Sequence, residues 1–234
     1  MKIVTWNINK AAYVRKGLWD FIKQMNFDIG FFQEVYIIPY ELRDKFFVIR
    51  GEMNAILINK NSDVKIKSKD VLKINSMNDV IRDFLLSCEV EFIEKNIILI
   101  NIYNYMGTDE KAFSEFLEIL YSFISRNQDK LFIFGGDFNI NSNFQGHFSA
   151  WGELAKNMIK KLSVLGYIDV LSRNLNNESI TFVTPNKKAS YQLDYLFIPN
   201  YVKVINVMTG NKNQIFNQKP RLSDHLPIIA EIEF

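Results

Sequence analysis

The chain has 234 residues, of which 48% are hydrophobic and 23% are charged, and its formal net charge is +2. A chain of this length and composition can bury a sizeable core as one domain over residues 1–234, which excludes an intrinsically disordered protein. No apolar run approaches the roughly 20 residues that cross a bilayer, so we expect no stable membrane insertion. The small net charge neither favours nor excludes a polyanionic partner.

The single cysteine and the first residues indicate a compartment. Cys88 lies in a strand-like run and has no second cysteine with which to form an intrachain disulfide, which is typical of a reducing environment. The segment from Met1 to Asn7 lacks the apolar stretch and cleavage site of a signal peptide. We therefore expect a cytoplasmic protein; a secreted enzyme without disulfides is the alternative.

Apolar periodicity in the first half of the chain predicts several strands and one helix. In chain order we expect a strand at 3–8, a helix at 15–25, a strand at 29–34, a hairpin of 46–50 and 54–59 that turns near Gly51, a loosely alternating strand at 65–73, and a hairpin of 84–92 and 97–103. The two hairpins favour antiparallel pairing in at least part of the sheet structure.

The second half of the chain adds two longer helices and further strands. In chain order we expect a helix at 109–125 with Thr108 as its N-cap, a buried strand at 131–134, a helix at 151–165 that ends at Gly166, and strands at 180–183, 193–198, 202–208 and 228–234. Many strands with few helices predict two packed sheets with helices on their outer faces. The fold class is therefore α/β and not a doubly wound nucleotide-binding sheet, since no Gly-x-Gly-x-x-Gly is present.

Six short patterns share one design, in which an apolar strand runs into a polar residue suited to metal binding or proton transfer. The patterns are Trp6-Asn7-Ile8-Asn9, Phe32-Gln33-Glu34, Ile102-Tyr103-Asn104, Gly135-Gly136-Asp137-Phe138-Asn139, Leu193-Asp194-Tyr195 and Ser223-Asp224-His225. Strand ends are held by a rigid scaffold, so several of them can present side chains to one pocket.

The residue types in these patterns suit phosphate chemistry. Glu34, Asn7 and Asp224 carry the carboxylate and amide oxygens that Mg²⁺ prefers. With one cysteine and two histidines in the chain, a Cys/His zinc site is not expected. Asp137 and His225 can orient water and stabilise the negative charge that develops on phosphorus oxygens.

With these motifs in this order, the chain resembles the endonuclease/exonuclease/phosphatase superfamily, which includes DNase I-like and abasic-site endonuclease enzymes. The resemblance extends from Trp6-Asn7 to Ser223-Asp224-His225. Gly-Asp-Phe-Asn and Ser-Asp-His are its most specific parts. The resemblance implies a four-layer α/β/β/α sandwich of two packed mixed sheets with outer helices, in agreement with the order of the predicted elements.

The resemblance also implies a metal site. Glu34 would be the central ligand of Mg²⁺, with Mn²⁺ as a substitute, and Asn7, Asn9 and Asp224 would lie on or near the metal. Tyr103 occupies the position where relatives carry a tyrosine or a histidine near the leaving group.

The catalytic residues follow from the same resemblance. Asp137 would position or deprotonate the attacking water, and Asn139 would hydrogen-bond the scissile phosphate. Asp194 would orient His225, which would contact the phosphate in the transition state. The expected reaction is in-line attack of water on phosphorus.

Two departures from the family pattern concern the substrate side. Tyr103 is followed by Asn104-Tyr105-Met106-Gly107, where nuclease relatives often carry Pro-Asn. Tyr191 stands where some abasic-site enzymes have tryptophan, so abasic-site specificity does not follow.

Basic and aromatic residues near the late motifs are candidates for substrate binding. Tyr191, Lys188 and Arg221 would contact the bases or backbone of a nucleic acid. The alternative is that this segment is an ordinary solvated loop surface.

Three functions are compatible with these residues. The preferred one is a Mg²⁺-dependent nuclease that hydrolyses DNA or RNA. The alternative is a phosphatase or phosphodiesterase for lipid, inositol or other small phosphoesters, although Ser190-Tyr191-Gln192-Leu193-Asp194 differs from the Pro-Ala-Trp-x-Asp-Arg run of inositol phosphatases. The third, a binding module without catalysis, is disfavoured by the intact acidic residues and His225.

Overall fold

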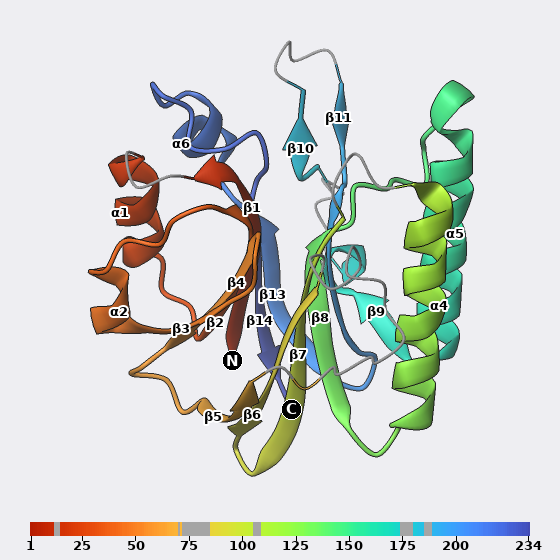
Figure 1. Cartoon of the computed structure of the whole chain (residues 1–234), viewed down its shortest axis with the longest axis horizontal. Coiled ribbons are helices and arrows are strands. Elements are labelled where there is room, and N and C mark those ends of the chain that lie inside the picture. The colour runs from red at the N-terminus through yellow and green to blue at the C-terminus, as the bar shows by residue number, and fades with distance from the viewer. Residues whose placement is uncertain (12–14, 70, 72–84, 105–108, 174–179, 185–188) are drawn as a thin grey trace.

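The structure, a computed structural model, describes residues 1–11, 15–69, 71, 85–104, 109–173, 180–184 and 189–234 (Figure 1). Two six-stranded sheets stand face to face, and helices cover their outer faces. The described helices include none that is both long and apolar enough to cross a membrane.

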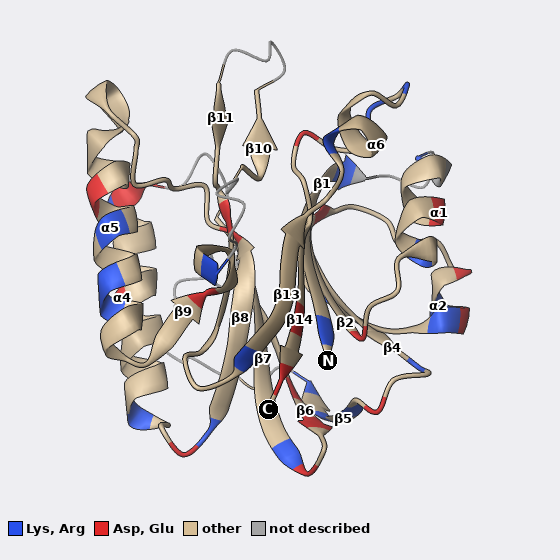
Figure 2. Cartoon of the chain, turned by 180° about the vertical axis from the view of Figure 1, so that it is seen from behind, with Lys and Arg blue, Asp and Glu red and all other residues tan. Residues whose placement is uncertain are grey.

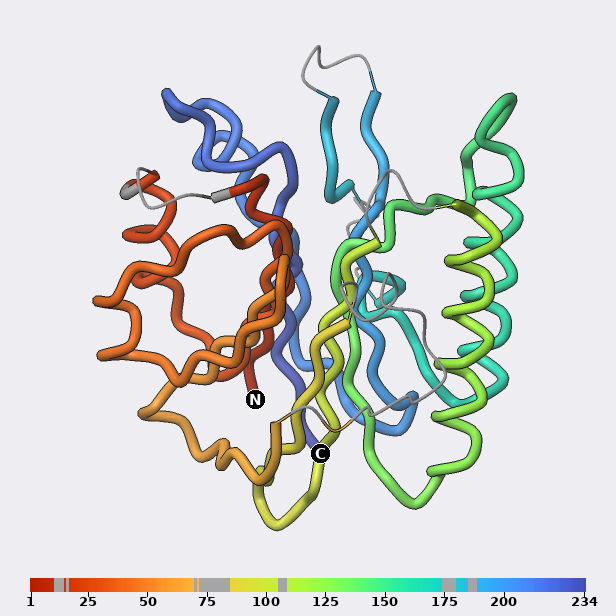
Figure 3. Tube along the Cα trace, viewed as in Figure 1, coloured from red at the N-terminus to blue at the C-terminus, as the bar shows by residue number. Residues whose placement is uncertain are grey.

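The first sheet has the strand order β13-β14-β1-β2-β4-β3. Its strands are β1 (Lys2–Ala11), β2 (Ile29–Val35), β3 (Phe46–Arg50), β4 (Asn54–Asn59), β13 (Lys203–Thr209) and β14 (Ile228–Glu233). β1 and β2 are parallel and the other pairs are antiparallel. The colour gradient in Figure 3 shows how the earliest and latest parts of the chain lie side by side in this sheet.

The second sheet has the order β5-β6-β7-β8-β12-β9. Its strands are β5 (Lys65–Lys69), β6 (Leu85–Phe92), β7 (Lys95–Tyr103), β8 (Leu131–Asp137), β9 (Tyr167–Asp169) and β12 (Asp194–Pro199). β7 and β8 are parallel, and the remaining pairs are antiparallel. Both sheets are therefore mixed.

Helices and short elements complete the outer layers. They are α1 (Lys16–Gln24), α2 (Leu42–Lys45) and α6 (Lys212–Phe216) beside the first sheet, α4 (Glu110–Arg126) and α5 (Ser149–Val164) beside the second, and the 3-10 turns η1 (Gly146–Phe148) and η2 (Val170–Arg173). A small hairpin of β10 (Phe182–Val183) and β11 (Ser190–Tyr191) projects above the upper edge of the sandwich. Figure 2 shows charged residues on the outward faces of α4 and α5, as expected for amphipathic helices.

Three apolar layers hold these four structural layers together. The largest lies between the sheets and includes Phe31 and Leu99. A second layer joins the second sheet to α4 and α5, and a third joins the first sheet to α1, α2 and α6. This arrangement confirms the predicted four-layer α/β/β/α sandwich.

Local boundaries differ from the predictions at several points. The N-cap of α4 is Asp109, whose side chain accepts a hydrogen bond from the Lys111 backbone N–H, while Thr108 lies outside the described residues. The described part of the strand predicted at 65–73 ends at Lys69. The strand predicted at 180–183 contributes only Phe182–Val183 to the small hairpin, and β9, α2 and α6 were not predicted.

Candidate active site

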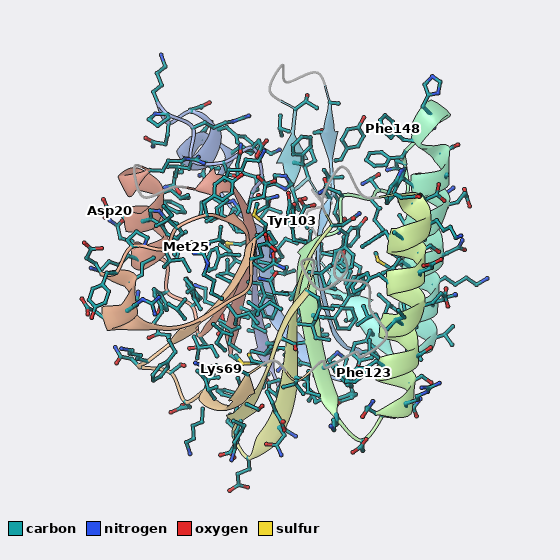
Figure 4. All side chains as sticks on the ribbon, in the orientation of Figure 1. Asp20, Met25, Lys69, Tyr103, Phe123 and Phe148 are labelled. Atoms are coloured by element: carbon teal, nitrogen blue, oxygen red, sulfur yellow. The ribbon has the colours of Figure 1, made fainter. Side chains whose placement is uncertain are left out.

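The polar residues of the six motifs meet at one edge of the sandwich. Asp137 ends β8, and in the backbone register it lies opposite Tyr103 of β7 on one side and Asp194 of β12 on the other. Asn7 and Glu34 lie near the ends of β1 and β2 in the facing sheet. Figure 4 shows Tyr103 between the two sheets, toward the hairpin end. Strand ends from both sheets thus converge, as the motifs predict.

A close backbone approach precedes Asp137. Gly136 has φ +143°, and a Cβ placed on it would lie 1.8 Å from the carbonyl oxygen of Ile102 in β7. Gly135 is similarly close to the backbone of β12. The two glycines therefore belong to a tightly paired strand and not to a plain turn, and the pairing fixes where the Asp137 side chain begins.

Asp137 is almost completely buried and is held by three amide donors. Its Oδ2 accepts from Asn7 Nδ2 at 2.8 Å and from Asn139 Nδ2 at 3.0 Å, and its Oδ1 accepts from the Asn139 backbone N–H at 3.0 Å. Asn139 Nδ2 also donates to the Asn104 carbonyl at 2.6 Å. Both amide hydrogens of Asn139 are thus used within the protein, so this geometry makes Asn139 a positioning residue for Asp137. Its predicted contact with the scissile phosphate stays a prediction.

Asn7 connects the two sheets. Its Nδ2 donates to Asp137 and, at 3.2 Å, to Glu34 Oε1, while its Oδ1 accepts from the Asn9 backbone N–H at 2.9 Å. The reverse amide orientation would place an oxygen against two carboxylates and a nitrogen against an N–H. Asn7 therefore presents its donor to the acidic residues. Asn9 contributes through its backbone, since its carbonyl also accepts from Arg15 Nη1 at 2.7 Å.

Glu34 is half-buried and its orientation is fixed from two sides. Its Oε1 accepts from Asn7 and from the Tyr103 hydroxyl at 3.0 Å. Tyr103 is 3% exposed, so it reaches this carboxylate from within the sandwich. Glu34 and Asn139 both have positive φ, 54° and 51°, which is uncommon for residues other than glycine and recurs at functional sites.

His225 and Asp194 form a buried pair next to Asp137. His225 Nδ1 lies 2.8 Å from Asp194 Oδ2, and Nε2 lies 3.9 Å from Asp137 Oδ2. Burial lowers the pKa of His225, but the charges of Asp194 and then Asp137 outweigh burial and raise this pKa. Burial raises the pKa of Asp137, which the charge of His225 opposes and that of Asp194 supports. A carboxyl group with a raised pKa is a better proton acceptor than an ordinary aspartate.

Ser223, to which the Ser-Asp-His motif gave no role, and Thr181, which lies in no motif, also position the site. Ser223 Oγ donates to the Asn7 carbonyl at 2.7 Å and accepts from the His225 backbone N–H at 3.0 Å. Thr181 Oγ1 accepts from the backbone N–H groups of Leu193 and Asp194 at 2.9 and 3.1 Å. The bond between Ser223 and His225 is local, whereas the bond from Ser223 to Asn7 and those to Thr181 join separate segments, so no local pattern could have revealed the latter.

A buried polar cluster joins the sheets beneath the site. Asn101 of β7 donates through Nδ2 to the carbonyls of Phe32 and Ala55, both at 2.9 Å, and its Oδ1 accepts from Gln33 Nε2 at 2.7 Å. Gln33 also donates to Thr5 Oγ1 at 3.2 Å. Gln33 and Glu34 are adjacent, so this cluster fixes the strand end that carries Glu34.

Ligand atoms for a divalent cation come from a buried cluster and from the predicted ligands Glu34 and Asp224. Asp137, Asp194 and His225 have ligand atoms within 4.8 Å of one another, but hydrogen bonds within the protein already use the Nδ1 of His225 and both oxygens of Asp137. Glu34 and Asp224 are half-buried, and Oε2 of Glu34 has no hydrogen-bond donor among the described residues. Their carboxylates are the hard oxygen ligands that Mg²⁺ prefers, so Glu34 and Asp224 stay the predicted ligands of this metal.

Two of the residues predicted to bind substrate, Arg221 and Tyr191, lie around the small hairpin. Arg221 lines a cleft of about 320 Å³ with Lys212, and its guanidinium lies 4.4 Å from the ring centroid of Phe216. Its Nη2 is buried without a hydrogen-bond partner in the described part of the chain. Tyr191 lines a larger cleft of about 610 Å³ on the side of α5 and β9. Lys188 lies outside the described residues.

Comparison with known proteins identifies similar folds. An AP endonuclease from Archaeoglobus fulgidus is 20% identical with a TM-score of 0.73 over 100% of both chains. D. rerio TDP2 in complex with a single-strand DNA product is 16% identical with a TM-score of 0.68, over 100% of this chain and 99% of that one. A variant of the 3' phosphatase NExo from Neisseria, bound to a product DNA hairpin, is 19% identical with a TM-score of 0.68 over 100% of both chains.

These solved structures share the fold at low sequence identity. No curated protein sequence gives a significant match to this chain. The model of the Endonuclease/Exonuclease/phosphatase family matches residues 4–225, which include all six motifs. The chain therefore belongs to the Endonuclease/Exonuclease/phosphatase family.

Proposed function

We propose that the protein is a Mg²⁺-dependent phosphodiesterase that hydrolyses the phosphodiester bonds of nucleic acids. The observation that carries this proposal is the buried Asp137 carboxylate, held by Asn7 and Asn139 and placed beside the His225–Asp194 pair. A buried proton acceptor next to an imidazole is the arrangement that hydrolysis of a phosphate ester needs.

Each residue of the site has a distinct role in the proposed reaction. Asp137 accepts the proton of the attacking water, which its raised pKa favours. His225 donates a hydrogen bond from Nε2 to a phosphate oxygen, and Asp194 holds the ring and stabilises its charge through Nδ1. Asn7 and Asn139 keep the Asp137 carboxylate fixed, which lowers the reorganisation needed during the reaction.

The proposal includes Mg²⁺ because two carboxylates of the site suit this metal. Glu34 and Asp224 would hold Mg²⁺, and Tyr103 and Asn7 would fix Glu34 by hydrogen bonds to Oε1. When bound, Mg²⁺ neutralises charge on the phosphate and stabilises the departing oxygen, and Mn²⁺ can substitute because it accepts similar oxygen ligands.

Three observations support a nucleic acid over a small phosphoester. Arg221 and Lys212 line a cleft beside the hairpin, where they can contact a phosphate backbone. The AP endonuclease, the single-strand DNA complex of TDP2 and the DNA-bound 3' phosphatase share this fold. The chain offers aromatic side chains near His225 as well, since the Phe182 ring centroid lies 4.9 Å from that of the imidazole.

The test is cleavage of single- and double-stranded DNA and RNA by the wild-type protein, with Mg²⁺ or with EDTA. Asp137→Asn is the catalytic variant, and Asp63→Asn, an exposed aspartate after β4, is the matched control. Cleavage that requires Mg²⁺ and Asp137 but not Asp63 is expected. Release of phosphate from lipid or inositol phosphates without cleavage of any polymer would instead support the small-phosphoester alternative.

A further inference from the structure

We propose that four aromatic residues form a track that stacks the unpaired bases of a single-stranded segment next to the scissile phosphate. The aromatic track consists of Phe182, Tyr191, Phe144 and Phe148. The proposal rests on the proposed function, because it names how that same site would hold its substrate.

The track begins at the candidate catalytic histidine. The Phe182 ring centroid lies 4.9 Å from that of His225. Phe182 is directly opposite Tyr191 in the antiparallel β10–β11 pair, so the two side chains stand on the same face of the hairpin. The hairpin therefore presents two neighbouring rings to the edge where the catalytic residues converge.

The track continues away from the catalytic residues toward α5. The ring centroids of Tyr191 and Phe144 are 5.0 Å apart, and those of Phe144 and Phe148 are 5.9 Å apart. Phe148 is 61% exposed and lies at the upper end of α5 on the side of the hairpin (Figure 4). The rings of Tyr191, Phe144 and Phe148 thus lead from the hairpin to an open surface, and Phe182, the register partner of Tyr191, lies beside His225.

These rings do not belong to the hydrophobic core. None of the four is a member of the three apolar layers that hold the sandwich together. Phe144, Tyr191 and Phe182 are half-buried, and their surroundings include the exposed residues Asn143 and Ser190. A line of partly exposed rings beside an active site has few uses in the folded chain itself, and it is a surface on which a flat apolar partner can bind.

In the proposed substrate, the bases of the nucleic acid are the flat groups that can reach the aromatic track. A strand with its phosphate at His225 has neighbouring bases within reach of the adjacent rings, and every base has a π-face that an aromatic ring can stack on. Paired bases inside a duplex keep their faces stacked on one another, so only an unpaired segment can use the track. The ligand of the aromatic track is therefore the unpaired base, whether it belongs to DNA or to RNA.

The opposite face of the hairpin suits the phosphate backbone. Val183 and Ser190, which alternate with Phe182 and Tyr191, line the cleft that contains Lys212 and Arg221. Tyr191 and the cationic groups therefore line different clefts beside the hairpin, and Ser190 lines both clefts. This division matches the two components of a single strand, since aromatic rings and a basic groove are the usual means of holding one.

The test measures binding without cleavage. Short oligothymidylate and oligouridylate, and a blunt DNA duplex of the same length, are titrated by fluorescence anisotropy in EDTA with proteins that carry Asp137→Asn. Adding Phe148→Ala should weaken binding of both single strands about five- to tenfold, because one ring–base stack is lost at a partly exposed site. Binding of the duplex should stay within twofold, which is about the resolution of such a comparison.

Two further variants control for folding and for ring chemistry. Tyr201→Ala removes an aromatic that is 72% exposed after β12, away from the track, and should leave binding unchanged. Phe148→Trp keeps a stacking surface and should retain single-strand affinity. Each variant should melt within a few degrees of its parent, because the replaced side chains are exposed.

The outcomes separate this proposal from the proposed function. Equal binding by Phe148→Ala and its parent, or equal losses on duplex and single strands, would overturn the track even if the wild-type protein cleaves nucleic acid. Failure of the wild-type protein to cleave any nucleic acid would overturn the proposed function, whereas the anisotropy measurement reports on the track independently.

Discussion

Replacing Asn101 with alanine tests how the two sheets are held together beneath the active site. The Asn101 side chain is fully buried and makes three hydrogen bonds, two to backbone carbonyls of the facing sheet and one from Gln33. Alanine keeps the strand but removes all three bonds. The substitution leaves one N–H of the Gln33 amide, which still donates to Thr5 Oγ1, and the two carbonyls without this partner in a buried interface.

The expected loss follows from these contacts. A buried polar group without its partner costs about 1–3 kcal/mol. The two carbonyls belong to paired strands and have other ladder partners nearby, so most of the loss comes from the Gln33 amide. We expect the free energy of unfolding to fall by about 3 kcal/mol, and the melting temperature to fall by about 6–12 °C for a chain of this length.

Urea unfolding followed by circular dichroism measures this loss. Asn200→Ala, which truncates an exposed asparagine after β12, is the matched control and should change stability by less than about 0.5 kcal/mol. A loss below about 1 kcal/mol for Asn101→Ala would show that the hydrogen bonds across the interface are readily replaced by water. The idea that they fix the strand end carrying Glu34 would then be wrong.

Three other measurements test the site and its surroundings. Asp137→Asn should reduce cleavage by at least about 100-fold, because it removes the proton acceptor; a melting scan beside the cleavage assay checks that the variant is folded. Mg²⁺ at about 100 times its dissociation constant should stabilise the wild type by about 2.7 kcal/mol in a thermal shift, and Glu34→Gln should lose most of this effect. Burial raises the pKa of Asp169 to about 6 from its ordinary 3.8, so folding favours its protonated form. This contribution is complete below pH 3.8 and is lost as the pH rises through about 6. Because Asp169 is half-buried, we expect the free energy of unfolding to fall by about 1–1.5 kcal/mol over this range, half or less of what the full pKa shift implies. Asp169→Asn should not show this fall.

The sandwich could be predicted because apolar periodicity marks each buried strand and the faces of α4 and α5. The convergence of Asp137, Asp194 and Tyr103 was also predictable in outline, since polar residues at strand ends share an edge of the sheet. Short elements such as β9, with three residues, lie below the length at which periodicity carries a signal. The left-handed backbone of Glu34 has no sequence signature, whereas asparagine, as at position 139, adopts this conformation more often than most residues.

The roles of the individual residues within the site were less predictable. Asn139 resembles a phosphate ligand in the motif, but its amide hydrogens are used by Asp137 and Asn104 in the folded chain. The partners of Asn101 and Ser223 come from distant strands, and an isolated polar residue in a strand does not name its partner. The roles of the site residues and of Lys188 stay predictions for the variants described above.

The hydrogen bond between Asn7 and Asp137 has a consequence for the chain while it is being made. Asn7 is in the first strand, Asp137 lies past the midpoint, and His225 belongs to the last segment before β14. Neither sheet alone contains the three groups. A partly synthesised or partly folded chain therefore lacks the assembled site, and only the finished molecule, with both halves in place, brings the three groups together.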